Sequence, residues 1–138
     1  MKLSHMLAVG FLVVAGCKAA PQKNLGTSVS GEIKLAPTLV GKVEKNNTVF
    51  IIAKGGFGPP VAVKKLTNVT FPFQFTLTEA DSMTPGQPWQ GPVKITARVD
   101  KDGNANPLSD GDLWGETKNP VSQEEKVAIL IDKEFTNR

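Results

Sequence analysis

The segment FPFQFTL, from Phe71 to Leu77, decides the fold class of this chain. Its large apolar residues stand at every second position, and a period of two is typical of a strand with one buried face. We therefore expect the three phenylalanines and Leu77 to face a hydrophobic core. Pro72 has no amide hydrogen to donate, which places it at the start of the strand or on an edge strand.

Strand patterns recur along the rest of the chain, separated by turn signals that include many of the 13 glycines and 10 prolines. Only Glu79–Met83 suggests a helical turn, and no longer helical period is present. This arrangement predicts one all-β domain, an immunoglobulin-like (Greek-key) β-sandwich of about six to seven strands over residues 29–138. The other expected strands are Val29–Leu35, Thr48–Lys54, Val61–Leu66, Val93–Val99, Leu113–Thr117 and Val127–Ile131.

The first 16 residues have the pattern of a secretory signal peptide. Lys2 supplies the positive charge, and Met6–Ala15 is an apolar run too short to span a bilayer. An aliphatic residue (Val14) and two small ones (Ala15 and Gly16) before Cys17 match a lipobox, so we expect the Cys17 sulfur to carry lipid. Residues 17–28 then form a flexible tether. Lys18, in place of an aspartate, favours the periplasmic face of the outer membrane, although the inner membrane remains an alternative.

The mature sequence argues against an enzyme and against a nucleic-acid-binding protein. His5, the single histidine, lies in the signal peptide, and the chain has no tyrosine and no cysteine besides Cys17. These absences remove the usual neutral-pH general base, the Cys-His and Ser-His nucleophile systems and most zinc sites. The densest basic pair is Lys64-Lys65, far from the clustered charge that nucleic acids require. We expect no cofactor.

An oxygen-rich stretch around Asp100, Asp102 and Asn104 is a weak calcium candidate. Its spacing departs from the EF-hand order, because glycine is the fourth residue and Gly111 occupies the twelfth position. The alternative is a turn after the Val93–Val99 strand, in which Gly103 supplies a positive φ. We favour the turn and expect no metal.

Three aromatic residues in loop-like stretches are candidates for contact with a partner: Phe57, Trp89 and Trp114. Phe57 lies in the glycine- and proline-rich segment 55–60, which is either a plain connection or a loop that presents the phenylalanine. The two tryptophans either cap the ends of the sandwich or form an exposed patch for a peptide.

Several blocks in a fixed order resemble the C-terminal periplasmic domain of the cytochrome c-type biogenesis protein CcmI, also called CycH. The resemblance extends over about residues 28–132, and these blocks carry it: Thr48–Lys54, Gly58–Leu66, Phe73–Leu77, Asp81–Gly86, Ala97–Val99, Lys101–Ala105 and Gly111–Gly115. In that family the domain accompanies membrane helices and tetratricopeptide repeats, which are missing from this sequence.

The resemblance implies a β-sandwich that takes part in handling apocytochrome c, as a binder of unfolded polypeptide. We therefore expect a lipid-anchored periplasmic module that binds apocytochrome c or another polypeptide, without enzymatic activity. Two alternatives remain: a structural envelope lipoprotein, and a calcium- or carbohydrate-binding accessory module.

Overall fold

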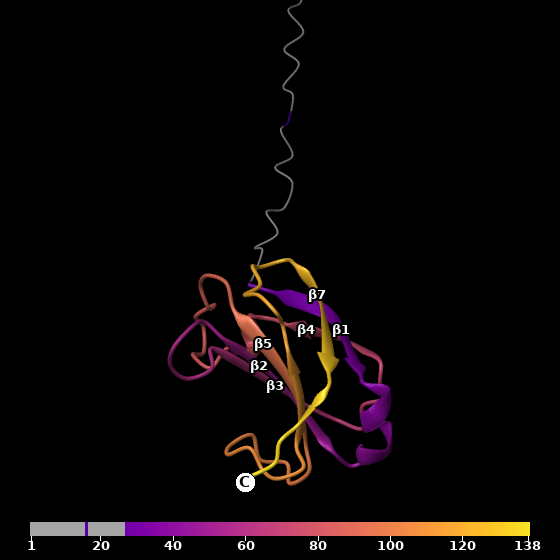
Figure 1. Cartoon of the computed structure of the whole chain (residues 1–138). Coiled ribbons are helices and arrows are strands. Elements are labelled where there is room, and N and C mark those ends of the chain that lie inside the picture. Colours follow the sequence, from indigo (N-terminus) through magenta and orange to yellow (C-terminus); the bar gives the residue numbers. More distant parts are fainter. Residues whose placement is uncertain (1–15, 17–26) are drawn as a thin grey trace, which may run out of the picture.

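Eight strands arranged in two sheets make up the domain in the computed structural model (Figure 1). The model describes residue 16 and residues 27–138, so Cys17 and all of the predicted signal peptide except Gly16 lie outside the described residues. The strands are β1 (Val29–Leu35), β2 (Thr48–Lys54), β3 (Ala62–Thr67), β4 (Phe73–Leu77), β5 (Lys94–Asp100), β6 (Leu113–Glu116), β7 (Lys126–Ile131) and β8 (Lys133–Glu134). Two 3₁₀ turns, η1 (Pro37–Lys42) and η2 (Glu79–Asp81), complete the elements.

The two sheets have the strand orders β4-β1-β7 and β3-β2-β5-β6-β8. All neighbouring strands are antiparallel except β1 and β7, which run parallel. The chain passes from one sheet to the other between β7 and β8. The predicted all-β sandwich of two sheets is thereby confirmed, and two-residue β8 is the strand that the sequence pattern did not show.

The core lies between the two sheets and follows the alternation of the sequence. Every second residue of β2 and β5 points inward, and all of these side chains are buried: Val49, Ile51, Ala53, Ile95, Ala97 and Val99. The facing sheet contributes Val29, Ile33, Phe75, Leu77, Ile129 and Ile131. Each fully buried side chain of this size stabilises the fold by roughly 1.5–3 kcal/mol relative to an exposed one. The period-two pattern therefore accounts for the position of the core.

The strand at Phe71–Leu77 is shorter than its alternation suggests. Hydrogen-bonded pairing with β1 begins at Phe73, because Pro72 cannot donate to a ladder. Phe75 is buried, whereas Phe71 and Phe73 are only half-buried and pack edge to face, with ring centroids 5.2 Å apart. Of the three phenylalanines expected in the core, only Phe75 is fully buried there.

The helical elements are both short. η2 coincides with the helical turn predicted at Glu79–Met83, and a reciprocal capping box between Thr78 and Asp81 explains its start. η1 was not predicted. Among the described residues, we find no helix with the length and hydropathy needed to cross a membrane.

Candidate functional site

Two loops at one end of the sandwich enclose a surface hollow of about 350 Å³. One loop, residues 55–61, joins β2 to β3, and the other, residues 82–90, follows η2. The amide of Met83 donates to the carbonyl of Val61 (2.9 Å), which holds the loops together. Gly56 and Gly58 have φ values of 128° and 117°, a conformation that other residues rarely adopt. The glycines therefore allow the turn that carries Phe57 outward.

The side chains around this hollow combine exposed and buried apolar groups. Phe57 is fully exposed (112%) and Met83 is 57% exposed, whereas Trp89 is only 5% exposed. Of the two alternatives for Trp89, the structure shows the buried one: its ring is buried in the wall of the hollow at the end of the sandwich and forms no exposed patch. Its carbonyl accepts a hydrogen bond from the Thr27 hydroxyl (3.3 Å), and its buried indole Nε1 has no acceptor among the described residues.

Both loops are free of charge. Residues 55–63 and 82–93 contain no Asp, Glu, Lys or Arg, although charged residues make up 21% of the chain. Within the second loop the Ser82 hydroxyl donates to the carbonyl of Gln87 (2.8 Å), which stabilises its shape. A neutral hollow with aromatic walls suits an apolar side chain, and nearby backbone groups suit a peptide segment. No group lining it has the nucleophile-and-base chemistry of a hydrolase.

Trp114 does not belong to this hollow. It lies in β6, where its side chain is half-buried on the outer face of the five-stranded sheet. The Lys133 ammonium stands 4.7 Å from the centre of its ring. The structure therefore brings Phe57 and Trp89 to one surface and places Trp114 on another.

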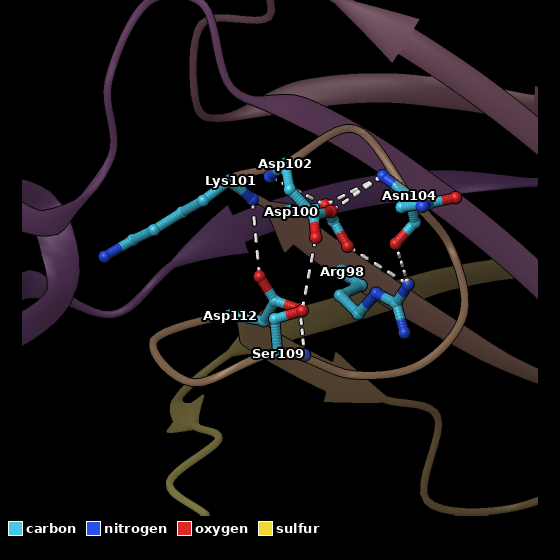
Figure 2. Close-up of polar contacts among 7 residues, drawn as sticks. All are labelled: Arg98, Asp100, Lys101, Asp102, Asn104, Ser109 and Asp112. Atoms are coloured by element: carbon cyan, nitrogen blue, oxygen red, sulfur yellow. Dashed lines mark hydrogen bonds and ion pairs between the residues drawn. The ribbon is translucent and has the colours of Figure 1, made fainter.

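Carboxylates organise the long loop between β5 and β6 (Figure 2). One oxygen of Asp100 accepts hydrogen bonds from the amides of Asp102 and Asn104, both at 3.1 Å. Asp112 likewise accepts from the amides of Lys101 (3.3 Å) and Ser109 (2.8 Å). These bonds satisfy loop amides that no strand partner reaches.

The calcium candidates do come together in this loop, but the carboxylate oxygens of Asp100 and Asp102 already have protein partners. The Asp100 oxygen Oδ2 lies 3.1 Å from the Arg98 guanidinium, which supplies the positive charge there. Asn104 contributes backbone groups: its amide donates to Asp100 and Asp102, and its carbonyl accepts from Arg98. Among the described residues, no group of three or more His, Cys, Asp or Glu side chains is arranged to hold a metal. The donor set therefore fits a turn better than a calcium site.

The titration of this cluster follows from burial. Burial raises the pKa of Asp100, and its side-chain hydrogen bond with Asp102 raises it further. The same hydrogen bond, together with the amide of Asn104, lowers the pKa of Asp102. Asp100 is completely buried and lines none of the hollows described here, so it has no access to a substrate. Gly103 has a φ of 76°, as the turn prediction requires, although the connection continues to Leu113 and is not a tight hairpin.

Sequence reasoning missed a second, larger hollow of about 490 Å³ beside η1. Its walls are largely apolar and come from the end of β1, the η1 region and the segment before β4: Leu35, Val40, Val43, Val69, Phe71 and Pro72. No single segment signals this hollow, because its walls come from three separate stretches and one exposed valine such as Val40 (59%) is common on protein surfaces.

Comparison with known proteins places the domain in a sequence family. The model of the family "Cytochrome c-type biogenesis protein H Ig-like domain" matches residues 29–132. An uncharacterized protein of Aquifex aeolicus (strain VF5) is 33% identical over 112 residues, which are 80% of this chain and 73% of that protein. The cytochrome c-type biogenesis protein CycH of Pseudomonas aeruginosa is 33% identical over 113 residues, 78% of this chain.

This chain spans only 27% of the length of the Pseudomonas protein. Among solved structures, an alternative pilotin from the type II secretion system of Vibrio cholerae aligns with a TM-score of 0.48 and 14% identity. That alignment covers 75% of this chain and 93% of the pilotin, and the likeness is too low to inform function.

Proposed function

Because this chain belongs to the family of cytochrome c-type biogenesis protein H Ig-like domains, we propose that it is a polypeptide-binding module acting in cytochrome c biogenesis. In this proposal the domain is not an enzyme, and its ligand is an unfolded stretch of apocytochrome c. The relation to CycH supports the process. The hollow between residues 55–61 and 82–90 supports the mode of action, and the exposed Phe57 is the single observation that carries it.

The hollow has the properties that a peptide site requires. Its volume of about 350 Å³ is enough for one or two apolar side chains. Phe57 and Met83 expose apolar surface to water in the free protein, and a bound peptide would bury that surface. The Trp89 indole N–H, buried without an acceptor among the described residues, would gain one from a peptide carbonyl.

We further propose that Cys17 carries lipid and anchors the module at the periplasmic face of the outer membrane. The support comes from the sequence, in the lipobox that ends at Cys17 and in Lys18. Thr27 contacts Trp89, so the tether joins the domain at the end that holds the hollow. Thr27 is ten positions after Cys17, and a fully extended chain of this length reaches about 35 Å. The peptide would thus be held close to the membrane surface.

Binding of synthetic apocytochrome c peptides tests the proposed function. The peptides should include the Cys-x-x-Cys-His segment with its thiols alkylated, and fluorescence anisotropy reports binding. We expect saturable binding that Phe57→Ser weakens by about 10-fold, the effect of a central aromatic contact. Val40→Ser is the control, because Val40 is also an exposed apolar residue (59%) but lines the other hollow.

Two results would count against this function. One is the absence of saturable binding at a peptide concentration of about 1 mM, which corresponds to less than about 4 kcal/mol of binding free energy. The other is equal weakening by Phe57→Ser and Val40→Ser, which would place the contact elsewhere on the domain.

A further inference from the structure

One row of side chains on the outer face of the five-stranded sheet alternates between cations and aromatic rings. The residues are Lys65, Phe50, Arg98, Trp114 and Lys133, one from each of the strands β3, β2, β5, β6 and β8. Each residue is in register with the next one along the row. Neighbouring positions in register bring side chains within contact distance. The five side chains therefore form a continuous ladder, which we call the cation–aromatic row.

The contacts within the row hold its cations over the rings. The Lys65 ammonium lies 5.8 Å from the centre of the Phe50 ring, and the Arg98 guanidinium carbon lies 5.7 Å from the same ring. Lys133 is placed similarly over Trp114. Phe50 and Arg98 are buried, whereas the two terminal lysines are exposed. The row thus presents a half-buried tryptophan between the buried Arg98 and the exposed Lys133, and Lys65 is exposed at its other end.

The surroundings of the row add positive charge. Lys54 and Lys94 are in register at the other end of β2 and β5 and border a hollow of about 440 Å³ on the same face. Glu116 also borders this hollow and pairs with Lys94 (2.8 Å). Among the described residues, no carboxylate lies within 4 Å of the ammonium of Lys54 or Lys65. Lys133 pairs with Asp132 (3.1 Å), so Lys54 and Lys65 are the cations of this face, among the described residues, that remain available to a partner.

The buried cation of the row also has unused hydrogen-bonding capacity. One terminal nitrogen of Arg98 serves Asp100 and Asn104, but its Nε is buried without an acceptor among the described residues. This nitrogen is buried, so a partner lying on the surface of the sheet does not reach it.

We infer that the cation–aromatic row is a second interaction surface and that it binds an acidic stretch of extended polypeptide. Adjacent strands are about 4.8 Å apart, so the row is about 19 Å long. An extended segment of about six residues spans this distance at roughly 3.3 Å per residue. Its carboxylates pair with the terminal lysines, and an apolar side chain covers Trp114. Complementary charge supplies the attraction, and the fixed spacing supplies the register.

The position of the row favours a polypeptide over the membrane surface as the partner. The row crosses β5 at Arg98, four residues or about 13 Å beyond Lys94. Thr27, where the tether joins the domain, contacts Trp89 on the other side of Lys94. If Cys17 anchors the chain, the row therefore lies on the part of the sheet that is farther from the anchor.

Anisotropy of a fluorescein-labelled Glu-rich peptide that contains one phenylalanine tests this inference on the mature chain. We expect the double variant Lys65→Glu/Lys133→Glu to bind at least about 10-fold more weakly than the wild type. Lys34→Glu/Lys126→Glu is the matched control, since it makes the same charge change on the outer face of the other sheet and should alter binding less than about 2-fold. Circular dichroism checks that both variants are folded.

Other outcomes would overturn the inference. Equal loss in both double variants would mean that net charge alone attracts the peptide. Equally tight binding of a Lys-rich peptide would remove the role of charge. Tighter binding to phosphatidylglycerol vesicles than to the peptide, with the same sensitivity to Lys65→Glu/Lys133→Glu, would make the membrane the partner. Phe57→Ser should leave this binding unchanged, so the row and the proposed apocytochrome site can fail independently.

Discussion

Gly115 stands where β6 passes closest to β7. A Cβ at this position would lie 2.0 Å from the carbonyl oxygen of Leu130 and 2.9 Å from the Cα of Ile131. Backbone atoms cannot rotate away as a flexible side chain does. A side chain here would have to push the two sheets apart, so glycine is required by the close approach itself.

Gly115→Ala should therefore destabilise the domain by at least about 2 kcal/mol, the range of severe steric overlap in a packed core. Urea denaturation followed by circular dichroism measures the change. Gly41→Ala serves as the control, because a Cβ at Gly41 meets no atom within 4 Å. If both variants unfold at the same urea concentration, the strands are not as close as described.

Residue type alone did not reveal the exposure of the three aromatic candidates. Phe57, Trp89 and Trp114 all stand in stretches rich in turn residues, yet one is exposed, one is buried and one is half-buried within a strand. The difference depends on which segments pack over each ring. Only the folded loops determine this, since a tryptophan has the same local pattern in both settings.

At the scale of elements, β3 and β4 are the edge strands that face each other across the open side of the sandwich. Lys64 of β3 has its backbone in register with core residue Ile51, so its side chain starts on the inner face. Its ammonium donates to the carbonyl of Thr76 in β4 (2.9 Å) and lies 3.6 Å from Asp81. An inward-pointing lysine ties the two sheets and discourages pairing with another chain.

Lys64→Met should consequently lower the free energy of unfolding by about 1 kcal/mol, the value of one hydrogen bond to a charged donor in a partly exposed setting. It should also increase self-association, because the edge loses its charge. Thermal melts and size-exclusion chromatography over a range of concentrations report the two effects. Lys118→Met removes an exposed charge outside the strands and should change neither reading; a variant at Lys64 that stays equally stable and monomeric would contradict this role.

At the scale of the whole molecule, the folded domain and the proposed lipid anchor occupy separate parts of the chain. The family match begins at residue 29, and the first described contact of the folded domain is that of Thr27 with Trp89. Cys17 lies outside the described residues, and its lipidation is a prediction from the sequence. Acyl chains contribute about 0.8 kcal/mol per buried methylene, so two or more chains hold a protein stably at a membrane.

Cys17→Ser should move the protein from the membrane fraction to the soluble fraction of cells without altering its unfolding temperature. Fractionation with a carbonate wash, followed by intact-mass measurement, shows the location and the loss of the acyl mass. Ser28→Ala, a comparable change at the other end of the tether, should leave both unaffected. A Cys17→Ser protein that stays in the membrane fraction would mean that another feature attaches it.

The sequence by itself determined the sheet content and the core. Alternation places Ile33, Ile95 and Ile129 on buried faces, because successive side chains of a strand point to opposite sides of the sheet. The family resemblance likewise rests on local blocks, and the family match to residues 29–132 confirms it. These features are encoded within single segments.

Only the tertiary structure decided which surfaces exist. The cation–aromatic row joins residues from Phe50 to Lys133, and the first hollow joins Phe57 to Trp89. Neither has a signature within one segment, since strand order and register bring their members together. Burial of Trp89 and the close approach at Gly115 have the same origin. Side-chain neighbours across strands are set by pairing, which depends on the packing of the whole domain and not on local pattern.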